Sequence, residues 1–200
     1  MLLSKSDYML YLAHPAWLWL KKHDKDKLPH IDDNTQATFD AGNLFEGYAE
    51  KLFDDGVRLG FSDYASYLAL PEQTMEALLG GAKTIYQARF IAGQLTCICD
   101  VVHVVGDKTF DLYEIKSSTK AKPEHATDLA FQAHVLRESG FTVRNINVIH
   151  VNNEYIRHGN INPEEFCTIT DVTSEVNALS EATKLHAQEA LEVMQSSDMP

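Results

Sequence analysis

Two neighbouring apolar segments carry three residues whose types and spacing could do chemistry. Asp100 lies in the segment 95–102, and Glu114 and Lys116 lie in the segment 110–119. Both segments are typical of β-strands, in which side chains alternate between the two faces, so Glu114 and Lys116 share a face. Two carboxylates and a lysine at one edge of a sheet are the minimum needed to bind a divalent metal ion and to activate water against a phosphodiester.

The elements that position these residues are predicted from the period of the apolar pattern. Residues 84–91, 95–105 and 109–116 are expected to be strands joined by short turns, which favours an antiparallel meander. Residues 123–139 have helical spacing, and residues 143–151 are almost continuously apolar. We therefore expect a crossover helix followed by a central strand in a mixed sheet.

Helices are predicted before this sheet. Ser4 or Ser6 is expected to cap a helix that runs to about Lys22, followed by a polar loop. A second helix is expected over residues 38–53, because its apolar residues recur at helical spacing before a turn sequence.

The remaining segments complete a single domain. Residues 62–79 are expected to be helical in part, with a break or a start at Pro71. The stretch from Thr170 onward is expected to be a terminal helix. We divide the domain into an N-terminal helix and loop, a core and a C-terminal helix, over residues 1–37, 38–170 and 171–200.

Charge and composition limit the classes of protein to consider. The chain has 200 residues, of which 44% are apolar, and a net charge of −12, which argues against nonspecific coating of nucleic acid. No apolar run approaches the roughly 18 residues of a membrane helix, so we expect a soluble, cytoplasmic protein with no membrane partner. The three cysteines, Cys97, Cys99 and Cys167, fit reduced buried thiols better than a disulfide framework or a zinc site.

The order of the elements and acids resembles the PD-(D/E)XK nuclease superfamily. Asp100 is similar to the first acid of its motif, and Glu114-Ile115-Lys116 is similar to the E-x-K half. The resemblance covers roughly residues 40–150. It implies an α/β fold with a restriction-endonuclease-like core, in which a mixed central β-sheet is flanked by helices.

Two further positions are similar to RecB-type members of this superfamily. Glu46 stands on the predicted helix before the sheet, where those members carry a histidine or an acid. Gln132 stands on the predicted helix after the sheet, where they carry a Q-x-x-x-Y motif, although Leu136 replaces the tyrosine here. That replacement weakens any nucleic-acid contact expected at residue 136.

The N-terminal sequence most resembles the opening of CRISPR-associated RecB-like exonucleases and their uncharacterised relatives. The resemblance lies in residues 3–8 and 14–20, where His14 takes the place of the usual cysteine before the proline. Those relatives often hold an iron-sulfur cluster with one N-terminal and three C-terminal cysteines. This chain lacks the first of these and has no cysteine after Cys167, so no iron-sulfur cluster is expected.

The chemistry of the side chains suggests how a metal would be held. The hard carboxylate oxygens of Asp100 and Glu114 suit Mg²⁺ or Mn²⁺, and the Ile115 carbonyl could add a third ligand. Glu46 would complete the metal site or hold it in place.

Roles in catalysis and structural alternatives are both open at this stage. Lys116 would have its pKa lowered beside the metal, or would orient the attacking water and stabilise charge on the phosphate. Gln132 would position the water or Lys116. Alternatively, Asp100 is an ordinary turn acid, Glu114 and Lys116 form an exposed ion pair, and Glu46 and Gln132 are surface residues of helices.

Three basic residues are candidates for contact with DNA. Lys120 and Lys122 follow the second acidic strand directly, and Arg89 lies on the first predicted strand, where it could instead pair with an acid. The predicted function is a metal-dependent DNA nuclease, of exonuclease type, in DNA repair, recombination, or phage or mobile-element defence. The alternatives are an interaction module with a weakened site, or a nuclease subunit of a larger complex, with a protein partner or a homo-oligomer.

Overall fold

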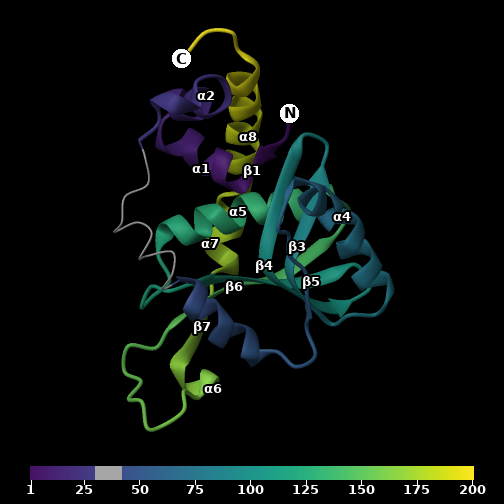
Figure 1. The fold of residues 1–200 in the computed structure, drawn as a ribbon, viewed down its shortest axis with the longest axis vertical. Coiled ribbons are helices and arrows are strands. Elements are labelled where there is room, and N and C mark those ends of the chain that lie inside the picture. The colour runs from purple at the N-terminus through teal and green to yellow at the C-terminus, as the bar shows by residue number, and fades with distance from the viewer. Residues whose placement is uncertain (30–41) are drawn as a thin grey trace.

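A seven-stranded mixed sheet forms the centre of the structure, a computed structural model that describes residues 1–29 and 42–200 (Figure 1). The strands lie in the order β2-β3-β4-β5-β6-β7, and β1 pairs with β4 off this path. Their bounds are β1 Leu3–Ser4, β2 Val57–Arg58, β3 Thr84–Ala92, β4 Leu95–Gly106, β5 Thr109–Lys116, β6 Thr142–Val151 and β7 Cys167–Asp171.

The predicted meander and crossover are confirmed. Strands β3, β4 and β5 pair antiparallel, through short turns in which Gly93 and Lys108 adopt positive φ. The chain then passes through α5 (Pro123–Glu138), which returns it to the edge of the sheet where β5 begins. Strand β6 therefore runs parallel to β5 and pairs with it. A mixed sheet is the necessary result, because a parallel neighbour requires a crossover connection.

Helices cover this sheet. In Figure 1, α1, α2 and α8 gather with α5 above the sheet. The bounds are α1 Lys5–Ala13, α2 Pro15–His23, η1 Lys25–Lys27, η2 Glu50–Leu52, α4 Tyr64–Leu79, α5 Pro123–Glu138, α6 Pro163–Phe166, α7 Thr173–Ala178 and α8 Ser180–Gln195. No helix in residues 1–29 or 42–200 combines the length and the apolar character needed to cross a bilayer.

The sheet buries apolar side chains on both of its faces. Successive residues of β6 show this, because Val148 belongs to the cluster beneath α5, whereas Ile149 belongs to a second, smaller cluster. The second cluster includes Phe45, from the helical residues 42–49. Of the predicted helix over 38–53, residues 42–52 are helical, and residues 38–41 lie outside the described residues.

The predicted single N-terminal helix is in fact two helices. Ser4 caps α1 as expected, and its side chain and that of Asp7 form a capping box. The break falls at His14, which is extended (φ −168°, ψ 129°), because the ring of Pro15 excludes the helical conformation from the residue before it. His14 then caps α2, whose first residue is Pro15.

The predicted break at Pro71 is wrong, and the reason involves Arg89. Helix α4 continues through Pro71, although proline has no N–H to donate to the carbonyl of Tyr67 four residues earlier. The Arg89 guanidinium donates to that carbonyl instead, at 2.7 Å, and stacks on the Tyr67 ring. Arg89 is 1% exposed and also donates to Thr96. The expectation that Arg89 contacts DNA is therefore wrong, because its side chain is enclosed within the protein.

Three short strands were not predicted. Strands β1 and β2 have two residues each, too few to show a period, and β7 occupies part of the predicted terminal helix. That helix begins at Thr173 rather than Thr170, as α7, and α8 follows it. Strand β7 forms because residues 167–171 pair with the end of β6, where Val151 and Asn147 have partners at Cys167 and Asp171.

Strand β1, with only two residues, determines where the N-terminal segment lies. Pairing between β4 and β5 ends at Val101 and Tyr113, so the first residues of β4 have no partner from β5. Strand β1 takes that place, with Leu3 opposite Leu95. Helix α1 starts directly after β1, at Lys5, whose side chain lies beside the end of β5, where the predicted site residues Glu114, Ile115 and Lys116 stand.

We expect the stability of α4 to depend on Arg89. Arg89→Met should lower the free energy of unfolding by roughly 2–4 kcal/mol, because it leaves the partly buried Tyr67 carbonyl without its donor and removes the stacking on the Tyr67 ring. Pro71→Ala restores an N–H to that carbonyl, so in the Pro71→Ala background the loss should be about 1 kcal/mol smaller. Urea unfolding of the two single variants and the double variant measures this coupling. Strictly additive losses would contradict it.

Candidate active site

Four of the predicted residues meet where β4 and β5 diverge. The Asp100 carboxylate takes the place of a backbone acceptor, because its Oδ2 accepts a hydrogen bond of 2.8 Å from the Ile115 N–H. Asp100, Glu114, Ile115 and Lys116 all line one open depression of about 430 Å³. The two backbones therefore separate here, and the carboxylates of Asp100 and Glu114 lie in the space between them.

Glu114 is the most constrained of these groups. It is 1% exposed, and its Oε1 accepts from the ammonium groups of Lys116 at 2.6 Å and Lys5 at 2.9 Å. Its Oε2 accepts from the Gln132 amide at 2.7 Å. Burial alone would raise the pKa of Glu114, but the two ammonium groups and the amide hold it well below its usual range. Glu114 is therefore a carboxylate at neutral pH.

Asp100 behaves in the opposite way. Burial raises the pKa of Asp100 to about 7, and the charge of Glu114 contributes to the increase, against the opposing effects of Lys5 and the Ile115 N–H. Two carboxylates in one depression thus differ in their affinity for a proton. A cation placed between them would relieve the repulsion that raises the pKa of Asp100.

The sequence analysis missed two residues of this cluster. Asp128, on α5, lies one turn before Gln132 and accepts from the same Gln132 amide at 3.1 Å. The Lys5 and Lys116 ammonium groups lie 3.3 and 3.1 Å from the Asp128 carboxylate. The i, i+4 spacing of Asp128 and Gln132 on a helix was a usable signal. Lys5 gave none, because 109 positions separate it from Glu114.

The predicted lowering of the pKa of Lys116 beside a metal stays a prediction, and the side chains around Lys116 act in the opposite direction. Burial lowers the pKa of Lys116, but Glu114 and Asp128 together raise it above its ordinary value. Lys116 is thus an ammonium that can donate hydrogen bonds, and about 30% of its side chain is exposed to the depression and solvent. Of the two roles considered, orientation of water and stabilisation of charge is the one that this charge state allows.

Glu46 lines the same depression from the helical residues 42–49. Its Oε1 accepts from the Gln87 amide at 2.8 Å and lies 3.3 Å from the Arg58 guanidinium. Gln87 has a positive φ of 58° within β3, at the position opposite Asp100. Non-glycine residues with positive φ are uncommon within strands. Glu46 therefore lines the depression, whereas Gln87 and Arg58, which hold its Oε1, are not part of that lining.

Lys120 and Lys122 lie in the exposed loop between β5 and α5, outside the lining of the depression. The Lys122 ammonium is 3.6 Å from the exposed carboxylate of Glu124. Contact of these lysines with DNA stays a prediction.

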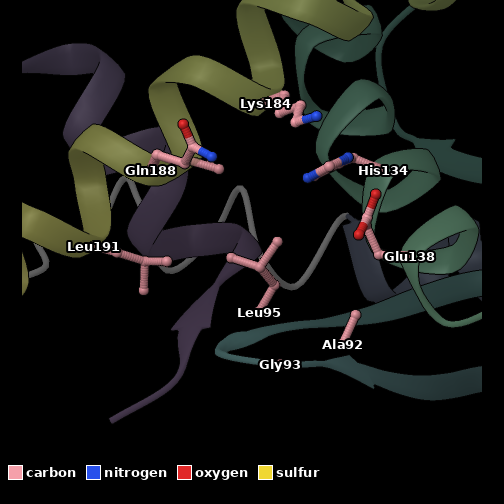
Figure 2. A pocket seen from close by; sticks show the side chains of 9 residues that line it. Ala92, Gly93, Leu95, His134, Glu138, Lys184, Gln188 and Leu191 are labelled. Carbon is pink, nitrogen blue, oxygen red and sulfur yellow. The ribbon is translucent and has the colours of Figure 1, made fainter.

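A second depression, shown in Figure 2, is distinct from the acidic one. It has a volume of about 250 Å³ and lies between the β3–β4 turn, the C-terminal part of α5, and α8. His134 and Glu138 face it from α5, and Lys184 and Gln188 face it from α8 (Figure 2). Among the described residues that line it, Glu138 is the one carboxylate, so this lining does not show the acid pair on which the metal hypothesis depends.

Comparison with known proteins bears on the fold. The alkaline exonuclease LHK-Exo from Laribacter hongkongensis superposes with a TM-score of 0.52 and 13% identity, over 97% of this chain and 88% of that one. The structure of LHK-Exo in complex with dAMP gives 0.51 and 12%, over 96% and 87%. This chain therefore shares its fold with that exonuclease. The restriction-endonuclease-like α/β class is confirmed, with a mixed sheet flanked by helices. No protein-family model matches the sequence, and no curated protein matches it.

The donor atoms fit a hard divalent cation in kind. Mg²⁺ commonly keeps several waters and takes one or two carboxylates from the protein, and Asp100 and Glu114 supply two from adjacent strands. The position of Asp100 and Glu114 in one depression favours a cation here, because burial first and the charge of Glu114 second raise the pKa of Asp100, and a cation would offset both effects. Within the described parts of the chain, no three acidic, histidine or cysteine side chains converge as a ready-made metal cage. Waters and the Ile115 carbonyl would have to complete the coordination.

We expect Asp100 to reduce stability at high pH in the absence of metal. Its folded pKa of about 7 exceeds its ordinary value of 3.8, so the folded state binds the extra proton between these values. Stability is therefore lost as the pH rises toward and through 7. Asp100→Asn should remove this loss, making the variant more stable than the wild type at pH 8 but not at pH 4.

Urea unfolding in EDTA across this pH range measures the effect. Asp107→Asn, in the exposed β4–β5 turn, is the matched control and should follow the wild type. A wild-type pH profile that coincides with that of Asp100→Asn would contradict the assignment.

Proposed function

We propose that this chain is a Mg²⁺- or Mn²⁺-dependent deoxyribonuclease of exonuclease type, which hydrolyses phosphodiester bonds. The observation that carries the proposal is the convergence of Asp100, Glu114 and Lys116 at the divergence of β4 and β5, in a chain with a nuclease fold. The two solved structures compared above are of an alkaline exonuclease, one of them in complex with dAMP. This likeness supports exonuclease action on DNA here.

Asp100, Glu114 and the Ile115 carbonyl would hold the metal, with Glu46 facing it across the depression. When bound, a divalent metal supplies Lewis-acid activation of water and of the scissile phosphate. Glu114 offers a permanent negative charge, because its pKa is low. Asp100 offers a carboxylate whose proton must leave before it can act as a ligand, so we infer that metal binding strengthens as the pH rises toward 7.

Lys116 and Gln132 lie on different sides of Glu114. Lys116 lines the depression that would take the substrate, whereas Gln132 is buried within the protein. Lys116 is a charged donor that can orient water or stabilise charge developing on a phosphate oxygen. Gln132 is completely buried, and its amide bridges Glu114 and Asp128, so it fixes the rotamer of the metal-binding acid. We propose it as a positioning residue. Its Oε1 has no hydrogen-bond partner among the described residues.

The substrate would reach an open depression, and the loop that bears Lys120 and Lys122 would contact its backbone. Because the chain carries a net charge of −12, its affinity for DNA would depend on these few local contacts and on bound metal. The motif resemblance to RecB-type and CRISPR-associated exonucleases supports a role in DNA repair, recombination, or defence against phage and mobile elements. A nuclease subunit of a larger complex is compatible with the same site.

Cleavage of end-labelled DNA tests this proposal. The wild type should degrade linear DNA with Mn²⁺ or Mg²⁺, leave closed circular DNA intact, and be inactive in EDTA. Glu114→Gln and Lys116→Met should each lower the rate by about 10²- to 10³-fold, because the first removes the charge of a metal ligand and the second removes a donor to the charge developing on the phosphate.

Glu72→Gln, an exposed charge change on α4, is the control and should retain full activity. Cleavage of circular DNA would reassign the protein as an endonuclease. If no DNA is cleaved and calorimetry detects no metal binding, the proposal fails, and an interaction module with a nuclease fold becomes the better explanation.

A further inference from the structure

Among the residues that the structure describes, Lys5 is the one basic side chain that reaches Glu114 and Asp128 from outside β5 and α5. Its Nζ lies 2.9 Å from Glu114 Oε1 and 3.3 Å from Asp128 Oδ1, and the charge of Asp100 also acts on it. About 24% of its side chain is exposed. An ammonium between carboxylates from two different elements occupies the kind of position that a cation would take.

The backbone delivers Lys5 to this position. Leu3 and Ser4 pair with the start of β4, and the Ser4 side chain caps α1, whose first residue is Lys5. Asp7, two residues further on, is 2% exposed and binds the ammonium groups of Lys21 and Lys22 at 2.9 and 2.7 Å. The start of α1 is therefore fixed to both the sheet and α2, so the direction of Lys5 is set by the fold.

Two ammonium groups already bind Glu114 Oε1, and they compete with any metal ion that would use this oxygen as a ligand. A carboxylate oxygen offers about two lone pairs, and Lys5 and Lys116 already take both on Oε1. Oε2 is bound to the Gln132 amide. A divalent cation that uses Oε1 must displace one ammonium, and it would also be repelled by both.

Of the two lysines, Lys5 is the one that can leave. The Lys5 ammonium lies 2.9 Å from Glu114 and 3.3 Å from Asp128. The Lys116 ammonium lies closer to both, at 2.6 and 3.1 Å. Lys5 also lines a third depression, of about 250 Å³, between α1, α4 and β4, which is separate from the one in Figure 2. This space gives its side chain a place to move into while its backbone stays in position.

Formal charges favour the same conclusion. Lys5 and Lys116 bring two positive charges to the three carboxylates Asp100, Glu114 and Asp128, so the cluster carries at most one net negative charge. Addition of a divalent cation without loss of an ammonium would reverse the sign of the cluster within a largely buried site.

We propose that the Lys5 ammonium is the built-in counter-ion of this acid cluster, and that it gives up Glu114 when a divalent cation binds. Lys5 thereby competes with the metal and holds Glu114 and Asp128 together in the metal-free protein. The inference rests on the proposed metal-dependent function and deepens it. It makes Lys5 a positioning residue that sets the affinity for the metal.

Titration calorimetry with Mn²⁺ in the absence of DNA tests the inference. Lys5→Met keeps the length of the side chain and removes its charge, so it should bind Mn²⁺ about five- to tenfold more tightly than the wild type. Lys27→Met removes the same charge from an exposed pair with Asp24, and should bind as the wild type does. The melting temperature of Lys5→Met should be lower than that of the wild type in EDTA and should rise more on addition of Mn²⁺.

Equal or weaker Mn²⁺ binding by Lys5→Met would overturn the inference. If that variant does not fold without metal, Lys5→Gln replaces it, and a crystal structure of the wild type with Mn²⁺ gives an independent answer. There the Lys5 Nζ should lie beyond hydrogen-bond distance from Glu114 Oε1, and a retained contact would overturn the inference.

The two proposals fail in distinguishable ways. A wild type that binds Mn²⁺ and cleaves DNA, with Lys5→Met unchanged in affinity, removes the role of Lys5 alone. A wild type that neither binds Mn²⁺ nor cleaves DNA removes both.

Discussion

The divergence of β4 from β5 is the constraint on which the rest of the site depends. Two paired strands would use their backbone groups on one another, but beyond Val101 and Tyr113 the strands separate, and the Asp100 side chain satisfies the Ile115 N–H instead. Glu114 is thereby turned into the same space. β1 can pair with β4 only because β5 has left, so the N-terminal segment and the acids share one origin in the sheet.

A buried carboxylate requires compensation, and this protein supplies it from several elements. Glu114 receives two ammonium groups and one amide, and each of these donors also contacts Asp128. The resulting network joins α1, β5 and α5 through charge rather than through apolar packing. Removal of one member leaves others buried and unpaired, so the members are energetically coupled.

The sequence was sufficient to predict those parts of the site that depend on a periodic pattern or on residues close together along the chain. The alternation in 95–116 predicted the meander, and the order of acids predicted which strand ends meet. It was insufficient where a contact depends on chain segments far apart: Lys5 reaches Glu114 across 109 positions, through a strand of two residues that has no detectable period. Arg89 was misplaced for a similar reason, because its partner is a carbonyl whose availability arises from Pro71.

That last contact changes how α4 relates to the sheet. A helix with an internal proline lacks one of its own hydrogen bonds, and here the replacement donor comes from β3, outside the helix. The secondary structure of α4 is thus completed by tertiary structure. Opening of β3 would leave the Tyr67 carbonyl of α4 without a donor. Fraying of α4 would leave the buried Arg89 guanidinium without this acceptor. Helix and strand therefore form one cooperative unit, whose local opening involves both elements at once.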